Sequence, residues 1–172
     1  MYKLILNLFF LLFWLSLLYF FRRETNTLIY GLILGIISAI CNYYLLFYHF
    51  KLVMFFAIYN LLILLEEFTK WISLYYYYST HKPQNIDVYT VGAAVGIGFA
   101  FIENSVSYIT RNLEILFIRG FTANIVHVFT CTISSYGLWK YKNTNKQYWL
   151  SLYFLSVLIH VLSNSVSSLI WP

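Results

Sequence analysis

The chain has 172 residues, of which 61% are apolar and only 10% are charged. Because soluble domains carry about one quarter charged residues, this composition excludes a soluble globular domain and indicates an integral membrane protein. The net charge of +5 does not indicate a nucleic-acid-binding protein, since the 11 basic residues are scattered over short segments and form no basic patch.

Long apolar stretches follow one another along the chain and predict about six membrane-spanning helices. A span needs roughly 20 mainly apolar residues to cross the hydrocarbon core, and the lack of water there makes helices the default. Apolar runs without alternation, such as Leu4 to Phe21, argue against a β-barrel. The predicted spans are residues 2–21, 27–48, 51–78, 88–110, 119–139 and 148–170.

No linker, low-complexity tract or repeat divides the sequence, so we expect an all-α, polytopic transmembrane helical bundle that forms one domain over residues 1–172. Basic residues near span ends favour an N-terminus outside the cytoplasm, with six on the predicted inner side and four on the outer side. The six are Arg22, Arg23, Lys82, Lys140, Lys142 and Lys146, and the four are Lys3, Lys51, Arg111 and Arg119.

Small and aromatic residues predict how the helices pack and where they meet the membrane surface. Glycines at helical spacing let helix backbones approach closely in lipid; they are Gly31, Gly35, Gly92, Gly96 and Gly98. The run Tyr75 to Tyr78, together with Trp71, ends the third predicted span and is expected to form an interfacial aromatic belt.

Polar and ionisable side chains inside the predicted spans are the main functional signal. A charged group at the bilayer centre costs at least about 2.5 kcal/mol, so such groups need partners and mark functional sites by default. The residues of this kind are Glu66, Glu67, Lys70, Glu103, Asn104, His127, His160 and Asn164.

Their depths predict that these groups meet in one layer. Glu66 lies 15 residues from both Lys51 and His81, near mid-membrane. His160 is also central, while Glu103 and His127 lie somewhat nearer the side that holds the termini. Glu66 and Lys70 are about 40° apart around a helix, and His160 and Asn164 are similarly stacked. Four helices therefore offer acid, base and amide groups to a single site.

The charges of this layer do not balance on their own. Three glutamates against Lys70 leave two uncompensated negative charges in a medium of low dielectric constant. We expect at least one glutamate to be protonated near neutral pH, unless a histidinium ion, Arg119 or a metal ion compensates. Lys70 is interpreted as a structural counter-ion, and Arg119 as a snorkelling anchor at a span edge that is able to reach Glu103.

Four short segments in this order resemble the PrsW family of glutamate-type intramembrane proteases, which is more distantly related to CAAX-prenyl and Abi proteases. The resemblance covers roughly residues 60–168. Its segments are Glu66 to Trp71, Gly98 to Asn104, Arg119 with His127, and His160 to Asn164. Two departures are modest: Cys131 stands where members often have Gly or Thr, and Asn164 where some have Asp.

The resemblance implies hydrolysis of a peptide bond in or beside the membrane by a catalytic core over about residues 51–170. Glu66 and Glu67 match the family's diglutamate, Glu103 its Phe-x-x-x-Glu motif, and His127 and His160 its later histidines. Our hypothesis is that Glu66 takes a proton from water while Glu67 or Glu103 adjusts its acidity. His127 or His160 then protonates the leaving amine, and Asn164 helps to bind the oxyanion, with Lys70, Asn104 and Arg119 in supporting roles.

Three alternatives use the same residues. Glu66, His127 and His160 are a plausible zinc set, although we expect no cofactor because zinc-protease motifs such as His-Glu-x-x-His are absent. Intramembrane acids and histidines also build proton or cation transporters, and a non-catalytic scaffold would bind peptides only. By resemblance we expect a single-span substrate such as an anti-sigma factor, in the bacterial cytoplasmic membrane.

Overall fold

The computed structural model describes residues 2–22, 25–49, 57–81, 85–110, 112–144 and 147–170. These residues form six α-helices and no strand, which confirms the expected all-α bundle. The helices are α1 (Tyr2–Arg22), α2 (Thr25–His49), α3 (Ala57–Thr80), α4 (Asn85–Thr110), α5 (Leu113–Thr144) and α6 (Tyr148–Ile170).

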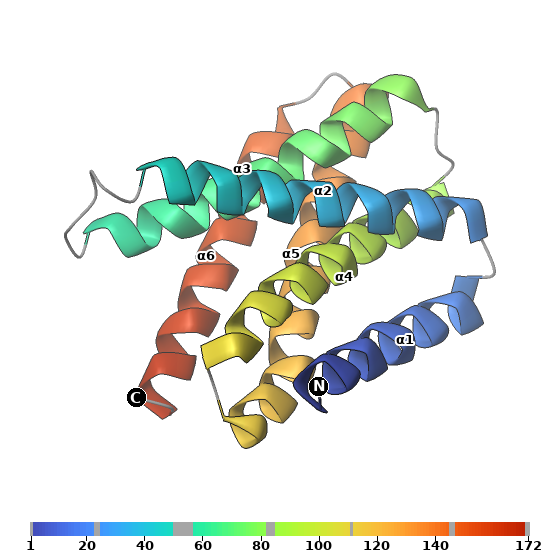
Figure 1. Ribbon diagram of the computed structural model, residues 1–172. Helices are drawn as coiled ribbons and strands as arrows, with labels where there is room; N and C mark the ends of the chain where they lie inside the picture. The colour runs from blue at the N-terminus through green and yellow to red at the C-terminus, as the bar shows by residue number, and fades with distance from the viewer. Residues whose placement is uncertain are drawn as a thin grey trace.

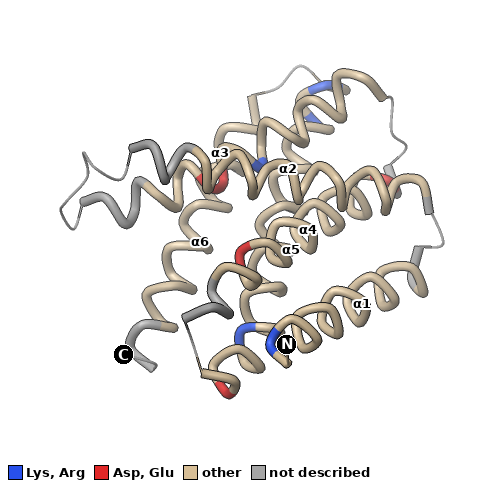
Figure 2. The backbone as a smooth tube through the Cα atoms, viewed as in Figure 1, with Lys and Arg blue, Asp and Glu red and all other residues tan. Residues whose placement is uncertain are grey.

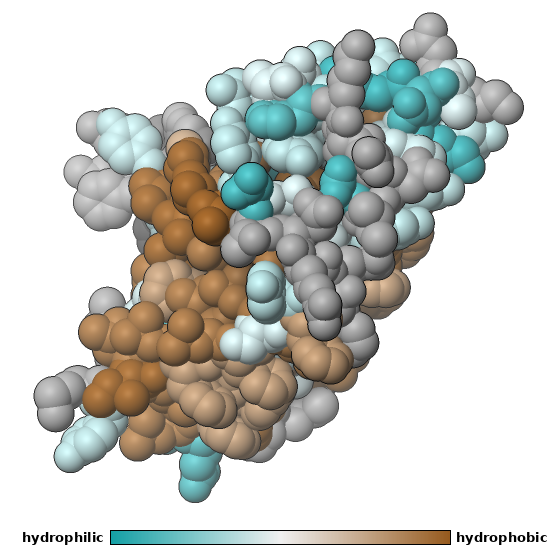
Figure 3. Space-filling view, turned by 90° about the vertical axis from the view of Figure 1, so that its right-hand side faces the viewer, coloured by the Kyte–Doolittle hydropathy of each residue, from teal (hydrophilic) through white to brown (hydrophobic). Residues whose placement is uncertain are grey.

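Five of the described helices, namely α1, α2, α4, α5 and α6, are long and apolar enough to cross a membrane. Helix α3 differs because it carries Glu66, Glu67 and Lys70 near its middle. The described parts of α2 and α6 carry no Lys, Arg, Asp or Glu, and Figure 2 shows the few charged positions of the chain. On the face drawn in Figure 3, a broad hydrophobic surface lies below a hydrophilic end. The protein is therefore an integral membrane protein.

The predicted spans agree with the helices, except that the fifth is shorter than the helix that contains it. It was expected over residues 119–139, whereas α5 covers Leu113–Thr144. Arg119 was taken as a span edge because basic residues favour the membrane surface. It lies instead within α5, where the carboxylate of Glu103 balances its charge. Residues 51–56, the predicted start of the third span, lie outside the described residues.

Helix α4 is the central element of the bundle and contacts α1, α2, α3 and α5 (Figure 1). Every residue from Thr90 to Ala100 is buried. Close packing depends on glycine, as predicted: a methyl group at Gly96 would lie 2.5 Å from the His127 carbonyl oxygen. A methyl group at Gly35 would collide with the α4 backbone at Val95. Helix α4 therefore holds α2 and α5 at backbone contact distance.

The predicted aromatic belt is only half correct. Tyr75 and Tyr76 are exposed, but Tyr77 and Tyr78 are 5% and 3% exposed and belong to the core. The Tyr78 hydroxyl lies 2.7 Å from Ser135 Oγ, and Lys142 Nζ donates to the Tyr78 carbonyl at 2.7 Å. Consecutive residues point in different directions around a helix, so a run of four tyrosines cannot all face the membrane surface.

Candidate active site

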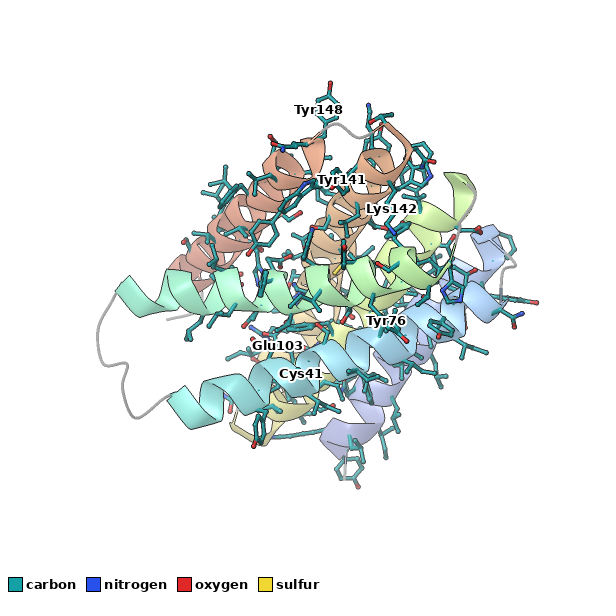
Figure 4. The ribbon with its side chains drawn as sticks, turned by 90° about the horizontal axis from the view of Figure 1, so that it is seen from above. Cys41, Tyr76, Glu103, Tyr141, Lys142 and Tyr148 are labelled. Carbon is teal, nitrogen blue, oxygen red and sulfur yellow. The ribbon has the colours of Figure 1, made fainter. Side chains whose placement is uncertain are left out.

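The charged residues of α3 meet the polar residues of α4, α5 and α6 in the interior of the bundle. Helix α3 contacts all three of these helices and also α2. Seen from above, Glu103 of α4 projects between the ribbons of α2 and α3 (Figure 4). The acid–base cluster formed here consists of Glu66, Glu67, Lys70, Glu103, Arg119, His127 and His160.

Glu67 is the most enclosed acid, with a side chain that is 0% exposed. It forms an ion pair with Lys70, one helical turn away on α3. The same oxygen, Oε1, lies 2.7 Å from His160 Nδ1 and accepts a weaker hydrogen bond from Thr130 Oγ1 at 3.4 Å. Because a buried carboxylate requires cationic and hydrogen-bonding partners, these contacts hold Glu67 in one orientation.

Glu103 is held by two residues of α5. Its Oε1 accepts a hydrogen bond from Arg119 Nη2 at 2.7 Å, and its Oε2 lies 2.5 Å from His127 Nε2. Arg119 therefore reaches Glu103, as the sequence allowed, and acts as its counter-ion instead of serving only as an anchor. Positions 119 and 127 are about two turns apart on α5, so one face of the helix presents both groups to the same carboxylate.

His127 links the two ion pairs. Lys70 Nζ lies 3.1 Å from its Nδ1, and Glu103 lies at its Nε2. An ammonium group only donates and a carboxylate only accepts, so the neutral ring accepts at Nδ1 and donates at Nε2. Lys70 also lies 4.6 Å from the centroid of the Phe99 ring. Both nitrogens of His127 are engaged, which makes it a structural bridge within the cluster.

Glu66 differs from the other two acids. The contact recorded for its carboxylate among the described residues is with His160 Nε2, at 3.7 Å from Oε2. Its side chain is 17% exposed, so Glu66 is partly open to the surroundings of the bundle. Lys70 and Arg119 compensate Glu67 and Glu103 respectively. The predicted excess of two negative charges is thus reduced to one, and it falls on Glu66.

The two predicted amides are not brought into the network in the same way. Asn104 is fully buried, yet neither polar atom of its side chain has a hydrogen-bond partner among the described residues. Asn164 is half-buried one turn beyond His160. Thr130, which donates to Glu67, was missed by the sequence analysis because a threonine inside a helix carries no distinctive signal.

Three residues of the cluster could also hold a metal ion. Ligand atoms of Glu67, His127 and His160 lie within 4.8 Å of one another, and Glu67 Oε2 is buried without a partner in the described part of the chain. Two histidines and a carboxylate are a common zinc set. The structure thus groups Glu67, and not Glu66 as expected, with the two histidines. Lys70 already contacts two of these ligands and would compete with a metal ion.

The fold and the cluster together define a polytopic membrane protein with an acid–base centre enclosed by its helices. Residues 45–172 match the family described as PrsW family intramembrane metalloprotease, and the chain belongs to this family. The predicted resemblance is therefore confirmed.

One curated relative is the protein named Protease PrsW of Halalkalibacterium halodurans, which is 32% identical over 111 residues. The match covers 62% of this chain and 51% of the relative, so the chain spans about half the length of that protein. No solved structure matches the chain.

Proposed function

We propose that this protein is an intramembrane endopeptidase in which Glu66 activates the water that attacks a peptide bond of a membrane-embedded protein. Membership of a protease family supports the reaction class. The observation that carries the assignment of Glu66 is its contact with His160 in the absence, among the described residues, of a cationic partner. A general base needs a free lone pair and access to water, whereas Glu67 and Glu103 are engaged by ion pairs.

The proton path follows from the contacts of His160. Its Nδ1 donates to Glu67, which leaves the Nε2 lone pair facing Glu66 at 3.7 Å. Glu66 takes a proton from water as the water oxygen bonds to the carbonyl carbon. The proton passes through His160 Nε2 to the amide nitrogen as the C–N bond breaks, and Glu67 stabilises the transient imidazolium. This use of a carboxylate to orient an imidazole follows the logic of catalytic triads.

The other members of the cluster hold these groups in place. Lys70 neutralises Glu67, His127 bridges Lys70 to Glu103, and Arg119 neutralises Glu103. Asn164, one turn beyond His160 on α6, is proposed to donate a hydrogen bond to the oxyanion. A fixed donor of this kind typically contributes about 10²- to 10³-fold in rate.

A metalloprotease variant of this mechanism is the second candidate, favoured by the unpartnered Glu67 Oε2. Glu67, His127 and His160 would hold the ion. When bound, zinc supplies Lewis-acid polarisation of a carbonyl group and acidifies coordinated water. In this variant Glu66 keeps its part, because it is the carboxylate beside the set that has no competing cation.

For the substrate, we propose a single-span membrane protein such as an anti-sigma factor, in the bacterial cytoplasmic membrane. A membrane-embedded cluster is suited to peptide bonds that soluble proteases do not reach. We further propose an N-terminus outside the cytoplasm. Removing the internally paired Arg119 from the outer count leaves six basic residues against three.

The decisive experiment is cleavage of a quenched-fluorescence single-span reporter peptide by the purified protein in proteoliposomes. Glu66→Gln should reduce the rate at least about 10³-fold, whereas Glu114→Gln, at an exposed acid in the first turn of α5, should leave it unchanged. The scheme is wrong if Glu66→Gln, Glu67→Gln and His160→Ala all retain cleavage. Proton or metal flux without cleavage would identify a transporter, and peptide binding that tolerates Glu66→Gln would identify a scaffold.

A further inference from the structure

Helix α2 runs alongside α4 in a fixed, parallel register. Positions Gly31 and Gly35 of α2 approach Ala94 and Val95 of α4 respectively, so residue numbers increase together on the two helices. Eight residues are slightly more than two helical turns on either helix. Advancing both helices by this amount from the Gly35–Val95 contact brings Tyr43 alongside Glu103.

The surroundings of Tyr43 agree with this register. Its phenol is within electrostatic range of the carboxylates of Glu103 and Glu66 and of the guanidinium of Arg119. The side chain is half-buried. In the view from above, the Glu103 side chain is seen in the gap between the ribbons of α2 and α3, the helices that carry Tyr43 and Glu66 (Figure 4). Tyr43 therefore adds a fifth helix, α2, to the four that form the cluster, and α2 supplied no predicted site residue.

The exposed members of the cluster lie on the same side as Tyr43. The side chains of Glu66, Glu103 and Arg119 are 17%, 19% and 22% exposed, whereas that of Glu67 is 0% exposed and that of His160 is 3% exposed. These three are the charged residues with which the Tyr43 phenol interacts. The Tyr43 phenol therefore lies on the partly exposed side of the cluster, where Glu66 is also found.

The open side needs a hydrogen-bond donor, and Tyr43 is suited to supply it. Ionised carboxylates only accept hydrogen bonds, so Glu66 and Glu103 cannot stabilise negative charge on a carbonyl oxygen. Arg119 is also a donor, and its Nη2 is bound to Glu103, whose charge the guanidinium neutralises. Among the described residues no hydrogen bond is recorded for the Tyr43 hydroxyl, which leaves its proton available.

We propose that Tyr43 is a further catalytic residue, whose hydroxyl donates a hydrogen bond to the oxyanion formed when the Glu66-activated water adds to the scissile carbonyl. This role rests on the proposed peptidase function. It places a residue of α2, outside the family match over residues 45–172, in contact with the reacting atoms. A donor that acts on the developing charge raises kcat more than it lowers KM.

The test compares Tyr43→Phe, which removes one oxygen atom, with Tyr44→Phe, which removes the same atom from a neighbour that is 62% exposed. With the reporter peptide, Tyr43→Phe should lower kcat about 10²-fold with KM nearly unchanged, and Tyr44→Phe should behave as the unaltered protein. Binding gives a second readout. Tyr43→Phe should weaken the binding of a peptide aldehyde, whose hydrate resembles the tetrahedral intermediate. It should not weaken the binding of the matching peptide alcohol.

The outcomes separate the two proposals. If the unaltered protein shows Glu66-dependent cleavage and Tyr43→Phe keeps its kcat, or loses only in KM, the role of Tyr43 is overturned and the proposed function stands. If no cleavage depends on Glu66, both fail. Equal weakening of the aldehyde and the alcohol would assign Tyr43 to ground-state binding and overturn the oxyanion role. A thermal unfolding midpoint equal to that of Tyr44→Phe shows that folding is intact.

Discussion

His160 lies between the two consecutive acids of α3: its Nδ1 is 2.7 Å from Glu67 Oε1, and its Nε2 is 3.7 Å from Glu66 Oε2. The two glutamates are neighbours in sequence but differ in environment, because Glu67 is sealed in the core and Glu66 is partly open. Two identical side chains can therefore have different roles: Glu67 orients the His160 imidazole, and Glu66 is proposed to activate water.

This division predicts different consequences for Glu67 and Glu66. Glu67→Gln should lower the free energy of unfolding by about 3 to 5 kcal/mol, because it leaves the Lys70 ammonium buried without its counter-ion. Thermal unfolding in detergent measures the effect. The double variant Glu67→Gln with Lys70→Met should recover most of the lost stability. The single variant Glu66→Gln should change the free energy of unfolding only slightly. Equal destabilisation by Glu66→Gln and Glu67→Gln would contradict this assignment.

The ion pair between Arg119 and Glu103 is also testable. If Arg119 were only an interfacial anchor, replacing it would not change the effect of replacing Glu103. The 2.7 Å contact predicts coupling, so a double-mutant cycle with Arg119→Gln and Glu103→Gln should give about 1 kcal/mol of interaction energy. Both side chains are partly exposed, which keeps this value below that of a sealed pair. A coupling energy near zero would restore the anchor interpretation.

Gly96 should control the position of His127. Alanine there would place a methyl group 2.5 Å from the His127 carbonyl oxygen and 2.7 Å from Val128 Cα, so α5 must move away from α4. Gly96→Ala is expected to destabilise the protein by about 1 to 3 kcal/mol and to reduce reporter cleavage sharply. Gly137→Ala is the matched control, since its nearest neighbours are two Leu152 side-chain atoms at 3.1 and 3.2 Å and Trp149 Cα at 3.2 Å, all farther away than the backbone atoms at Gly96. Equal effects from the two glycine variants would refute this.

Lys70 should compete with a metal ion. Its ammonium group contacts Glu67 and His127, two of the three clustered donors. Lys70→Met should therefore raise the zinc affinity of the purified protein by at least about tenfold, measured by calorimetry and elemental analysis. Lys142→Met, outside the cluster, serves as the control. Unchanged affinity in Lys70→Met would show that the ammonium group does not occupy the space of a cation.

Most of the fold was predictable because the bilayer imposes a simple rule. Backbone groups in lipid must be paired within a segment, so long apolar stretches become helices whose ends lie near the predicted ones. The fifth span is the exception. Arg119 looks like a span edge in sequence, whereas the structure places it within α5 and pairs it with Glu103 of another helix.

The cluster was predictable in membership but not in pairing. The free energy of placing an ionisable group in lipid marks five residues as members of a site, and their depths indicate one layer. They are Glu66, Glu67, Glu103, His127 and His160. Helical spacing placed Lys70 on the same face as Glu66, but its ion pair is with Glu67. Side-chain rotamers and neighbouring helices decide such a choice, and neither is encoded in residue spacing.

By itself, therefore, the sequence determined the class of the protein, the number of helices and the set of ionisable groups that must meet, since all three follow from the free energy of placing residues in lipid. Only the tertiary structure decided which acid has no Lys or Arg partner, that Arg119 pairs with Glu103, and that Tyr43 of α2 is within electrostatic range of the site. These features depend on contacts between helices distant in sequence, whose register is set by close packing of the glycine-rich α4 against α2 and α5.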